Sequence, residues 1–325
     1  MRFEQQLSEV FKTLGIPGVT VKSVGVGPTL GRFAIKVPEG TRSARVCNLS
    51  DDVALAMGVT AVWFTKPIAP WTFGLDIPRR SRKRVDFNTI RWSGQGSNHA
   101  IPLYIGSDVT GQHIVPDLAD LPHLLIAGRT GSGKSVCLHS IISSIHERLS
   151  AYLVLIDPKH VEFEEYRNSP LLKHPVVTES QTASEVIHQL LEDVDKGFRR
   201  LAEYGVKDVS SLAELGVPVR RTVVVIDELA DLLLDSTAET EKDLIRIAQK
   251  GRAVGIHLVL ATQRPTVDVV SGLLKANIPS RIAFQVTSKL ESRIVLDQQG
   301  AESLLGRGDF LFQSGQTLLR GQCAI

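Results

Sequence analysis

Residues 128–135 combine glycines, a lysine and a serine at a spacing that suits phosphate binding. Glycines let backbone N–H groups turn inward around phosphate oxygens, and a helix that begins directly afterwards adds positive potential. Lys134 is then placed to reach the β and γ phosphates of a nucleotide, and the Ser135 hydroxyl to ligate Mg²⁺. The candidate nucleotide-binding residues are Gly128, Arg129, Thr130, Gly131, Ser132, Gly133, Lys134 and Ser135.

The context of this loop matches what the pattern requires. It follows an apolar run at residues 123–127 and opens the helical sequence SVCLHSIISSI. A strand, a glycine-rich loop and a helix in this order are typical of a phosphate-binding loop. By itself the loop leaves kinases, GTPases and ATPases open.

A second candidate group lies in VVVIDELADLL, where an apolar strand ends in two acidic residues. Asp227 is placed to hold Mg²⁺ through water, and Glu228 to polarise an attacking water. Two acidic residues could simply cap the strand end. The catalytic interpretation is stronger, because open parallel sheets bind their ligands at the carboxyl ends of the strands.

Two further strands separate this chain from kinases and GTPases. The strand YLVLI lies between the phosphate-loop strand and the acidic strand and ends in Asp157-Pro-Lys159. An extra strand together with a catalytic glutamate resembles the ATPases, rather than the kinases and GTPases, among proteins with a phosphate loop. The strand HLVLAT ends beside Gln263, which we expect to sense the γ-phosphate or the lytic water; an amide on a solvated loop is the alternative.

The apolar runs that carry these residues do not alternate with polar ones. They lie at residues 123–127, 152–156, 222–226, 256–261 and 281–286, with helical stretches between them. This pattern predicts an α/β domain over residues 101–325, built on a mainly parallel sheet that is buried on both faces. Residues 1–100 predict a small α+β accessory domain that contains a hairpin around Gly27-Pro28.

Composition places the chain among ordinary soluble proteins, with 43% hydrophobic and 22% charged residues. No apolar run is long enough to span a membrane, and the N-terminus lacks the features of a signal peptide. Three cysteines in no metal-ligand spacing favour reduced thiols in the cytoplasm. Residues 1–100 carry 14 Lys/Arg and 7 Asp/Glu, and the remainder carries 23 and 28. This asymmetry, with the run RRSRKR at residues 79–84, suggests a polyanion near the first domain or merely a solvated surface.

Several long stretches resemble the motor region of the FtsK/SpoIIIE DNA translocases. The resemblance extends over residues 121–313, and its most specific block runs from Ala248 to Phe284. The first domain is similar, more loosely, to the small domain that precedes the motor in this family. The resemblance implies a RecA-like P-loop ATPase that uses ATP and Mg²⁺. It also implies a homo-oligomer, a hexameric ring that threads double-stranded DNA and moves it without reading its sequence.

The resemblance also assigns roles to residues at matching positions. Arg252 corresponds to the arginine that reaches into the neighbouring subunit's ATP site, where it would neutralise developing charge. Contacts with DNA phosphates are implied for Arg264, Thr266, Lys275 and Arg293. Each of these cationic side chains could alternatively be an ordinary solvated residue.

Well-known members carry N-terminal membrane helices and a C-terminal winged helix, and from this sequence we expect neither. The expected process is therefore open between chromosome segregation and mobile-element DNA transfer. A coupling ATPase for conjugation or DNA packaging is one alternative. A nucleotide-dependent DNA-binding scaffold is another, although such a scaffold needs no catalytic glutamate. The alternative that the chain is a P-loop kinase is weaker, because it would leave the extra strand and Gln263 unexplained.

Overall fold

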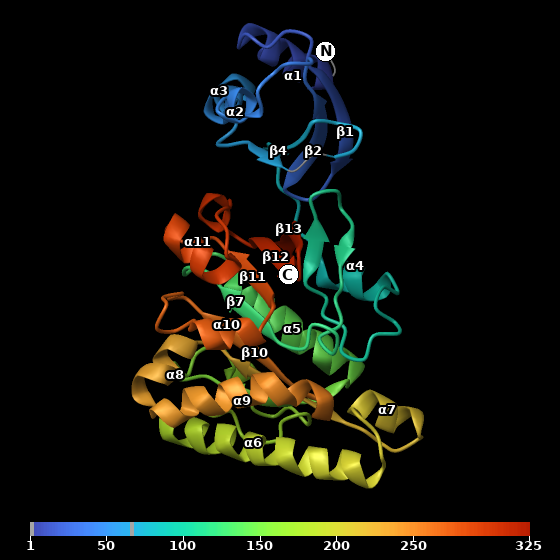
Figure 1. The fold of residues 1–325 in the computed structure, drawn as a ribbon, viewed down its shortest axis with the longest axis vertical. Helices are drawn as coiled ribbons and strands as arrows, with labels where there is room; N and C mark the ends of the chain where they lie inside the picture. Colours follow the sequence, from blue (N-terminus) through green and yellow to red (C-terminus); the bar gives the residue numbers. More distant parts are fainter. Residues whose placement is uncertain (1–2, 66–67) are drawn as a thin grey trace. The chain divides into compact units, whose positions relative to one another are not determined.

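A computed structural model of the protein describes residues 3–65 and 68–325. The chain forms two compact units, each with helices and strands of its own (Figure 1). Each unit also has a buried apolar core. The first unit contains residues 1–86 and the short segment Gly106–Ile114, and the second contains Phe87–Ile105 and Val115–Ile325. Among the described residues, no helix combines the length and the apolar character needed to cross a bilayer.

Among its described residues, the first unit has a four-stranded antiparallel sheet, three helices and the short antiparallel strand pair β5–β6, as expected of an α+β domain. The sheet order is β1-β2-β4-β3, and the predicted hairpin around Gly27-Pro28 joins β1 to β2. Leu7 and Phe11 of α1 are fully buried, because their spacing places both on the helix face that meets the sheet. The elements are α1 (Phe3–Thr13), β1 (Thr20–Val26), β2 (Leu30–Lys36), α2 (Ser43–Cys47), α3 (Ser50–Met57), β3 (Trp63–Thr65), β4 (Phe73–Pro78), β5 (Gly106–Asp108) and β6 (His113–Ile114).

The second unit is built on a large, mainly parallel sheet, which confirms the predicted fold class. Within this unit the strand order is β13-β12-β11-β7-β10-β9-β8. The five strands from β11 to β8 are parallel, and the β12–β13 hairpin adds two antiparallel strands beside β11. The strands are β7 (Leu124–Ala127), β8 (Ala151–Ile156), β9 (Arg221–Ile226), β10 (Ile256–Thr262), β11 (Ser280–Phe284), β12 (Asp309–Ser314) and β13 (Thr317–Cys323).

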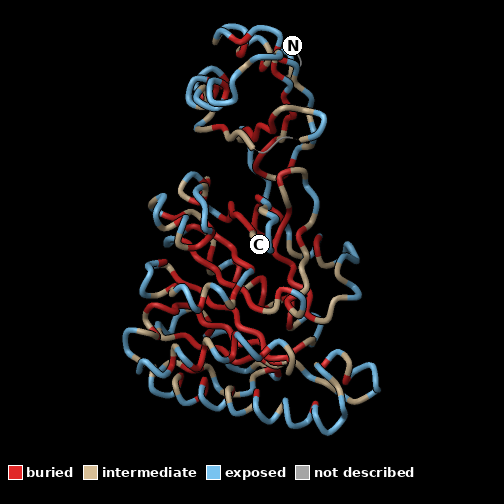
Figure 2. The backbone as a smooth tube through the Cα atoms, viewed as in Figure 1, coloured by how far each residue is buried: buried red, intermediate tan, exposed pale blue. Residues whose placement is uncertain are grey.

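Helices follow the parallel strands, as the alternating pattern predicts. Apolar residues of α6, α8, α9 and α11 pack with one face of the sheet in a continuous core, and Figure 2 shows buried residues concentrated along the strands. The strands are apolar without alternation because residues of both faces are buried. The helices are α4 (Phe87–Trp92), α5 (Lys134–Arg148), α6 (Ser180–Glu203), α7 (Val209–Glu214), α8 (Leu229–Asp235), α9 (Ala238–Val254), α10 (Gly272–Asn277) and α11 (Lys289–Leu296).

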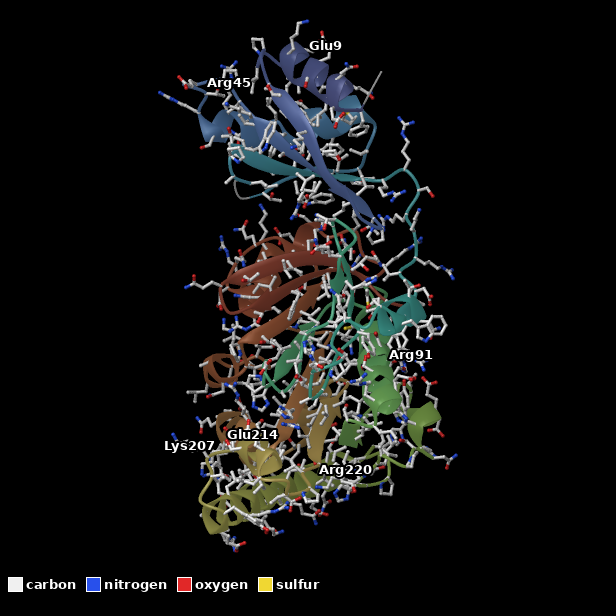
Figure 3. The ribbon with its side chains drawn as sticks, turned by 90° about the vertical axis from the view of Figure 1, so that its right-hand side faces the viewer. Glu9, Arg45, Arg91, Lys207, Glu214 and Arg220 are labelled. Carbon is white, nitrogen blue, oxygen red and sulfur yellow. The ribbon has the colours of Figure 1, made fainter. Side chains whose placement is uncertain are left out.

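Residues 87–105 belong to the second unit, and the predicted boundary at residue 100 lies within this segment. Within this segment, residues 87–92 form α4. The Phe87 N–H donates to the Ile325 carbonyl at 3.1 Å, and Arg91, labelled in Figure 3, pairs with Glu147 of α5. These contacts tie α4 to residues far away in the sequence.

Two buried histidines lie at the amino ends of the central strands. The His257 Nδ1–H donates to the Pro122 carbonyl at 2.8 Å, and the Leu258 N–H donates to His123 Nδ1 at 3.0 Å. Burial lowers the pKa of His123 to about 3 and that of His257 to about 4. Both imidazoles are therefore neutral at pH 7, and each leaves its Nε2 without a partner among the described residues.

Candidate nucleotide-binding site

The glycine-rich loop connects β7 to α5, as the sequence predicts. Gly131 and Gly133 have φ values of +74° and +118°, a backbone conformation that favours glycine. A Cβ on Gly133 would lie 2.7 Å from the Gly308 backbone, so a larger residue would displace the loop. The helix begins at Lys134 with Gly133 as its N-cap, and its first N–H groups have no helical acceptor. This geometry suits an anionic phosphate group.

The loop borders a cavity of about 340 Å³. Its lining includes Arg129, Thr130, Gly131, Gly133, Lys134, Ser135, Glu162 and Gln263. Gly128 packs against Phe284 so closely that a Cβ there would approach that side chain to 2.6 Å. The buried Ser132 hydroxyl has no partner among the described residues. The Arg129 guanidinium donates to Gln285 Oε1 at 2.6 and 3.1 Å, so this side chain is held at the rim by the segment after β11.

Lys134 lies against the first acidic residue of the β9 terminus. Its Nζ donates to the Asp227 carbonyl at 2.7 Å and to Asp227 Oδ1 at 2.5 Å. Both side chains are almost completely buried, and burial raises the pKa of Asp227 while the lysine opposes that shift. Mutual pairing compensates two charges that would be costly to bury separately. The sequence-predicted lysine and aspartate are therefore in direct contact.

Glu228 is held by three donors at the end of β9. The Thr262 hydroxyl donates to Oε1 at 2.7 Å, and the Gln263 N–H lies 3.1 and 3.0 Å from the two carboxylate oxygens. Lys159 Nζ lies 3.3 Å from Oε2 and 3.3 Å from Asp231 Oδ2. Glu228 is 1% exposed, so these contacts fix a buried carboxylate in one orientation.

Gln263 joins Glu228 to the phosphate loop. Its backbone contacts the carboxylate, and its side-chain Oε1 accepts from the Thr130 hydroxyl at 2.7 Å. This contact is possible because β10 lies between β7, which leads into the loop, and β9, which leads into Glu228. The next residue, Arg264, is exposed, and its N–H donates to Thr262 Oγ1 at 3.0 Å. One short segment therefore contacts the loop and the carboxylate and carries an exposed cation.

Sequence reasoning missed three residues of this site: Lys159, Glu162 and Thr262. Two of them come from the loop after β8, which Asp157 organises. The buried Asp157 carboxylate accepts from the N–H groups of Lys159, Glu162 and Phe163 at 3.2, 2.9 and 3.1 Å. A polar Asp-Pro-Lys sequence at the end of a buried strand was the available signal. Its partners could not be identified without the fold.

The oxygen atoms near the loop suit a magnesium ion. Asp227 Oδ2 is buried and has no partner among the described residues, and Ser135 supplies a hydroxyl. Carboxylate and hydroxyl oxygens are ligands that Mg²⁺ accepts, together with phosphate oxygens of a nucleotide. Ser135 and Asp227 would hold the ion, which would neutralise negative charge on the phosphates.

Arg252 is not part of this cavity. It is exposed near the end of α9 and lines a separate cavity of about 740 Å³ with Lys207, Arg221 and Lys250 (Figure 3 labels Lys207). His257 borders the same cavity, which places it toward the amino ends of the strands. The phosphate loop follows the carboxyl end of β7, so a chain does not bring its own Arg252 to its own loop.

The four residues expected to contact DNA have different surroundings. Arg264, Thr266 and Arg293 are exposed. Lys275 is not a free cation: its Nζ lies 2.6 Å from Asp297 Oδ1, and Arg281 shares the same carboxylate at 2.6 Å. Its charge is already compensated inside the fold, which makes Lys275 a weaker candidate for phosphate contact than Arg264.

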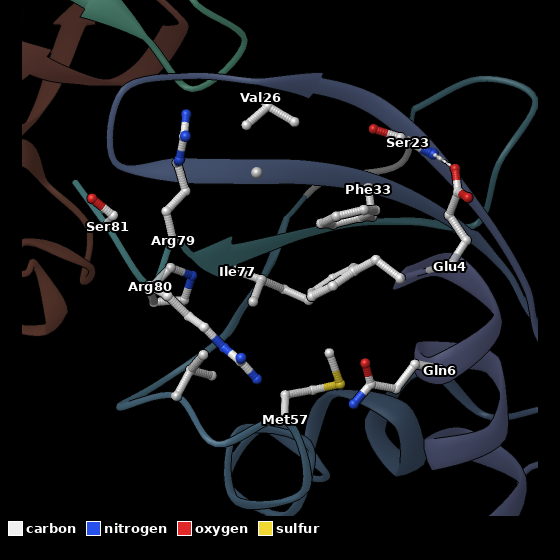
Figure 4. A pocket seen from close by; sticks show the side chains of 14 residues that line it. Glu4, Gln6, Ser23, Val26, Phe33, Met57, Ile77, Arg79, Arg80 and Ser81 are labelled. Atoms are coloured by element: carbon white, nitrogen blue, oxygen red, sulfur yellow. Dashed lines mark hydrogen bonds between the residues drawn. The ribbon is translucent and has the colours of Figure 1, made fainter. Parts of the chain in front are cut away.

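The first unit has a cavity of its own, of about 720 Å³ (Figure 4). Phe33, Met57 and Ile77 provide apolar surface, and Arg79 and Arg80 border it. Arg79 donates to the Gly27 carbonyl at 2.9 Å, whereas residues 80–84 of the cationic run are exposed. The first arginine of RRSRKR therefore stabilises the hairpin turn, and the rest of the run faces solvent.

A parallel sheet, a phosphate loop on a helix N-terminus and an acidic residue pair at a strand end define a P-loop ATPase fold. Solved structures share it. The pCW3 conjugation coupling protein TcpA, in its monomer form with ATPγS, matches with a TM-score of 0.70 and 23% identity over 99% of this chain and 94% of that one. The cytoplasmic domain of the Thermomonospora curvata type VII secretion ATPase EccC matches with a TM-score of 0.61 and 22% identity over 69% and 28%.

The chain belongs to the FtsK/SpoIIIE family. The model of that family matches residues 92–220 and 213–267, and the FtsK alpha domain model matches residues 1–79. The DNA translocase FtsK of Lactococcus lactis subsp. cremoris is 41% identical over 94% of this chain and 43% of its own length. The protein of the same name from Treponema pallidum is 42% identical over 97% and 41%. The chain thus spans less than half the length of these relatives.

Proposed function

We propose that this chain is an ATP-driven motor that moves double-stranded DNA as part of a hexameric ring in the cytoplasm. The observation that carries the proposal is the hydrogen-bonded connection from Thr130 through Gln263 to Glu228, with Arg264 directly beside it. The relatives named DNA translocase FtsK supply the substrate class. The three free cysteines support a reducing compartment.

The proposed hydrolysis uses the groups around the phosphate loop. Lys134 and the loop N–H groups bind the β and γ phosphates, while Ser135 and Asp227 hold Mg²⁺. Glu228 orients the attacking water and accepts its proton. In the structure Lys134 contacts Asp227 instead, so we expect its ammonium group to turn toward the phosphates when ATP binds.

The proposed coupling runs through Gln263 and Arg264. A change at the γ-phosphate would disturb the contacts that Gln263 makes with Thr130 and Glu228. Arg264, with Thr266 and Arg293, would hold phosphates of the DNA backbone without reading sequence. Because Gln263 and Arg264 are adjacent, movement of the first displaces the second.

The position of Arg252 supports the proposed ring. This arginine lines a cavity separate from the loop of its own chain, so the role that the family resemblance implies for it would be played at the site of another subunit. An arginine supplied from a neighbour stabilises transition-state charge in other P-loop enzymes. Hydrolysis would then require the assembled ring.

The deciding experiment is steady-state ATP hydrolysis by the purified chain without DNA, with single-stranded DNA and with long duplex DNA. We expect strong stimulation by the duplex alone, followed by displacement of a bound obstacle from the duplex. Hydrolysis that is indifferent to DNA would contradict the motor proposal. ATP binding without any hydrolysis would favour the nucleotide-dependent scaffold.

A further inference from the structure

A side chain from outside the expected motifs contacts the hydroxyl of Ser135. The Ser135 Oγ–H donates to Glu162 Oε1 at 2.8 Å, and the two residues are separated by 27 positions in the sequence. Glu162 lines the same cavity as the phosphate loop. Its second oxygen, Oε2, lies 3.5 Å from His139 Nε2.

The position of Glu162 is built into the fold. Its own N–H donates to Asp157 Oδ2 at 2.9 Å, and the following N–H, of Phe163, donates to the same oxygen at 3.1 Å. The Phe163 side chain is fully buried, and Asp157 is 1% exposed. A buried carboxylate and a buried ring therefore anchor the segment that presents Glu162 to Ser135.

The contact has a consequence for metal binding. A serine hydroxyl has one proton and two lone pairs, and it can ligate a cation only through a lone pair. Glu162 accepts the proton, so both lone pairs of Ser135 Oγ stay available. Partners of this kind orient metal ligands and raise their ability to donate.

We propose that Glu162 is a positioning residue for magnesium, acting through the Ser135 hydroxyl rather than as a ligand itself. The inference rests on the proposed binding of Mg²⁺ and nucleotide at this loop. It adds a role for Glu162 in the loop after β8, a residue that none of the sequence motifs covers.

The test measures how the affinity for a fluorescent ATP analogue depends on Mg²⁺ concentration, with no need for turnover. We expect Glu162→Ala to raise the Mg²⁺ concentration for half-saturation about 10- to 100-fold. Affinity for the analogue without Mg²⁺ should stay close to wild type. Glu162→Gln keeps an oxygen acceptor and should retain most of the Mg²⁺ effect.

A double variant decides whether Glu162 acts through Ser135. If it does, Ser135→Ala with Glu162→Ala should need no more Mg²⁺ than Ser135→Ala alone. Additive losses would instead make Glu162 a ligand in its own right and overturn the proposal, as would a normal Mg²⁺ response in Glu162→Ala. The matched control is Glu165→Ala, because Glu165 also contacts His139 but is 65% exposed. If the wild-type protein binds no nucleotide, the proposed function fails. If the wild type binds nucleotide with Mg²⁺ and the Glu162 variants respond to Mg²⁺ in the same way, only the inference about Glu162 fails.

Discussion

The backbone N–H of Gln263 lies 3.1 and 3.0 Å from the two carboxylate oxygens of Glu228. The side chain of the same glutamine accepts a hydrogen bond from Thr130 in the phosphate loop. A single residue thus contacts the proposed general base and the proposed phosphate site. We therefore propose that a motion of the loop on nucleotide binding is transmitted to Glu228 through Gln263, and that the adjacent Arg264 moves with it.

Replacing Glu228 by glutamine should separate binding from hydrolysis. Glu228→Gln keeps the shape of the side chain and one acceptor oxygen for Thr262 and Gln263, but it removes the base. We expect ATP binding within about threefold of wild type and a loss of at least about 100-fold in turnover. Equilibrium binding and single-turnover hydrolysis measure the two effects. Normal turnover would remove Glu228 from its proposed role.

Lys159 should matter for turnover more than for binding. Its ammonium is the cation that faces the buried Glu228 carboxylate. Without it, Glu228 loses its charged partner and one of the three donors that fix its orientation. We expect Lys159→Met to lower kcat about tenfold with little change in KM, and Lys159→Arg to recover much of the loss. Lys173→Met, which breaks a salt bridge to Asp193 away from the site, is the control. Faster hydrolysis in Lys159→Met would show that the lysine restrains Glu228 instead.

The Arg252→Ala variant should fold and bind ATP but hydrolyse it slowly. If Arg252 acts at the site of a neighbouring subunit, we expect the rate of hydrolysis to fall about 1000-fold. Mixing this variant with Glu228→Gln subunits provides the stringent test. Neighbours of the two kinds create some sites with an intact Glu228 and an intact Arg252 from the next subunit, so activity should reappear. Full activity of Arg252→Ala by itself would contradict the assignment.

Arg264→Ala should keep basal hydrolysis and weaken the response to DNA. The side chain is exposed and makes no ion pair among the described residues, so its removal costs the fold little. We expect weaker duplex binding and a salt dependence reduced by about one phosphate contact. Arg246→Ala removes another exposed arginine, which lies on α9 beside Asp243, and serves as the control. Unchanged stimulation by duplex DNA would place Arg264 away from the DNA path.

The buried His257 should make stability depend on pH. Its pKa is about 4 in the folded protein, below the ordinary value of 6.5, so the unfolded chain binds the proton first as pH falls. The contribution of the neutral His257 to the free energy of unfolding is therefore lost progressively as the pH falls from about 6.5 toward 4. His257→Asn can keep the hydrogen bond to Pro122 and removes this titration. Urea unfolding should show that the variant loses about 2 kcal/mol less than wild type between pH 7.5 and 5. Identical losses would contradict the neutral, buried state of His257.

Much of the fold and the centre of the site could be predicted from the sequence, because the signals are local. The spacing of glycines, lysine and serine from Gly128 to Ser135 predicts a phosphate-binding loop. Asp227 and Glu228 end an apolar strand, and five such strands without alternation indicate a parallel sheet with both faces covered. These features depend on residues close together in the chain.

The tertiary structure alone decided the partners of these residues. β10 lies between β7 and β9, and this order brings Gln263 to Thr130 and to Glu228. The loop after β8 places Lys159 and Glu162 at the site. Lys275 forms an ion pair with Asp297. Contacts between residues this far apart depend on which strands become neighbours. Strand order follows from the packing of the whole sheet, which no short stretch of sequence encodes.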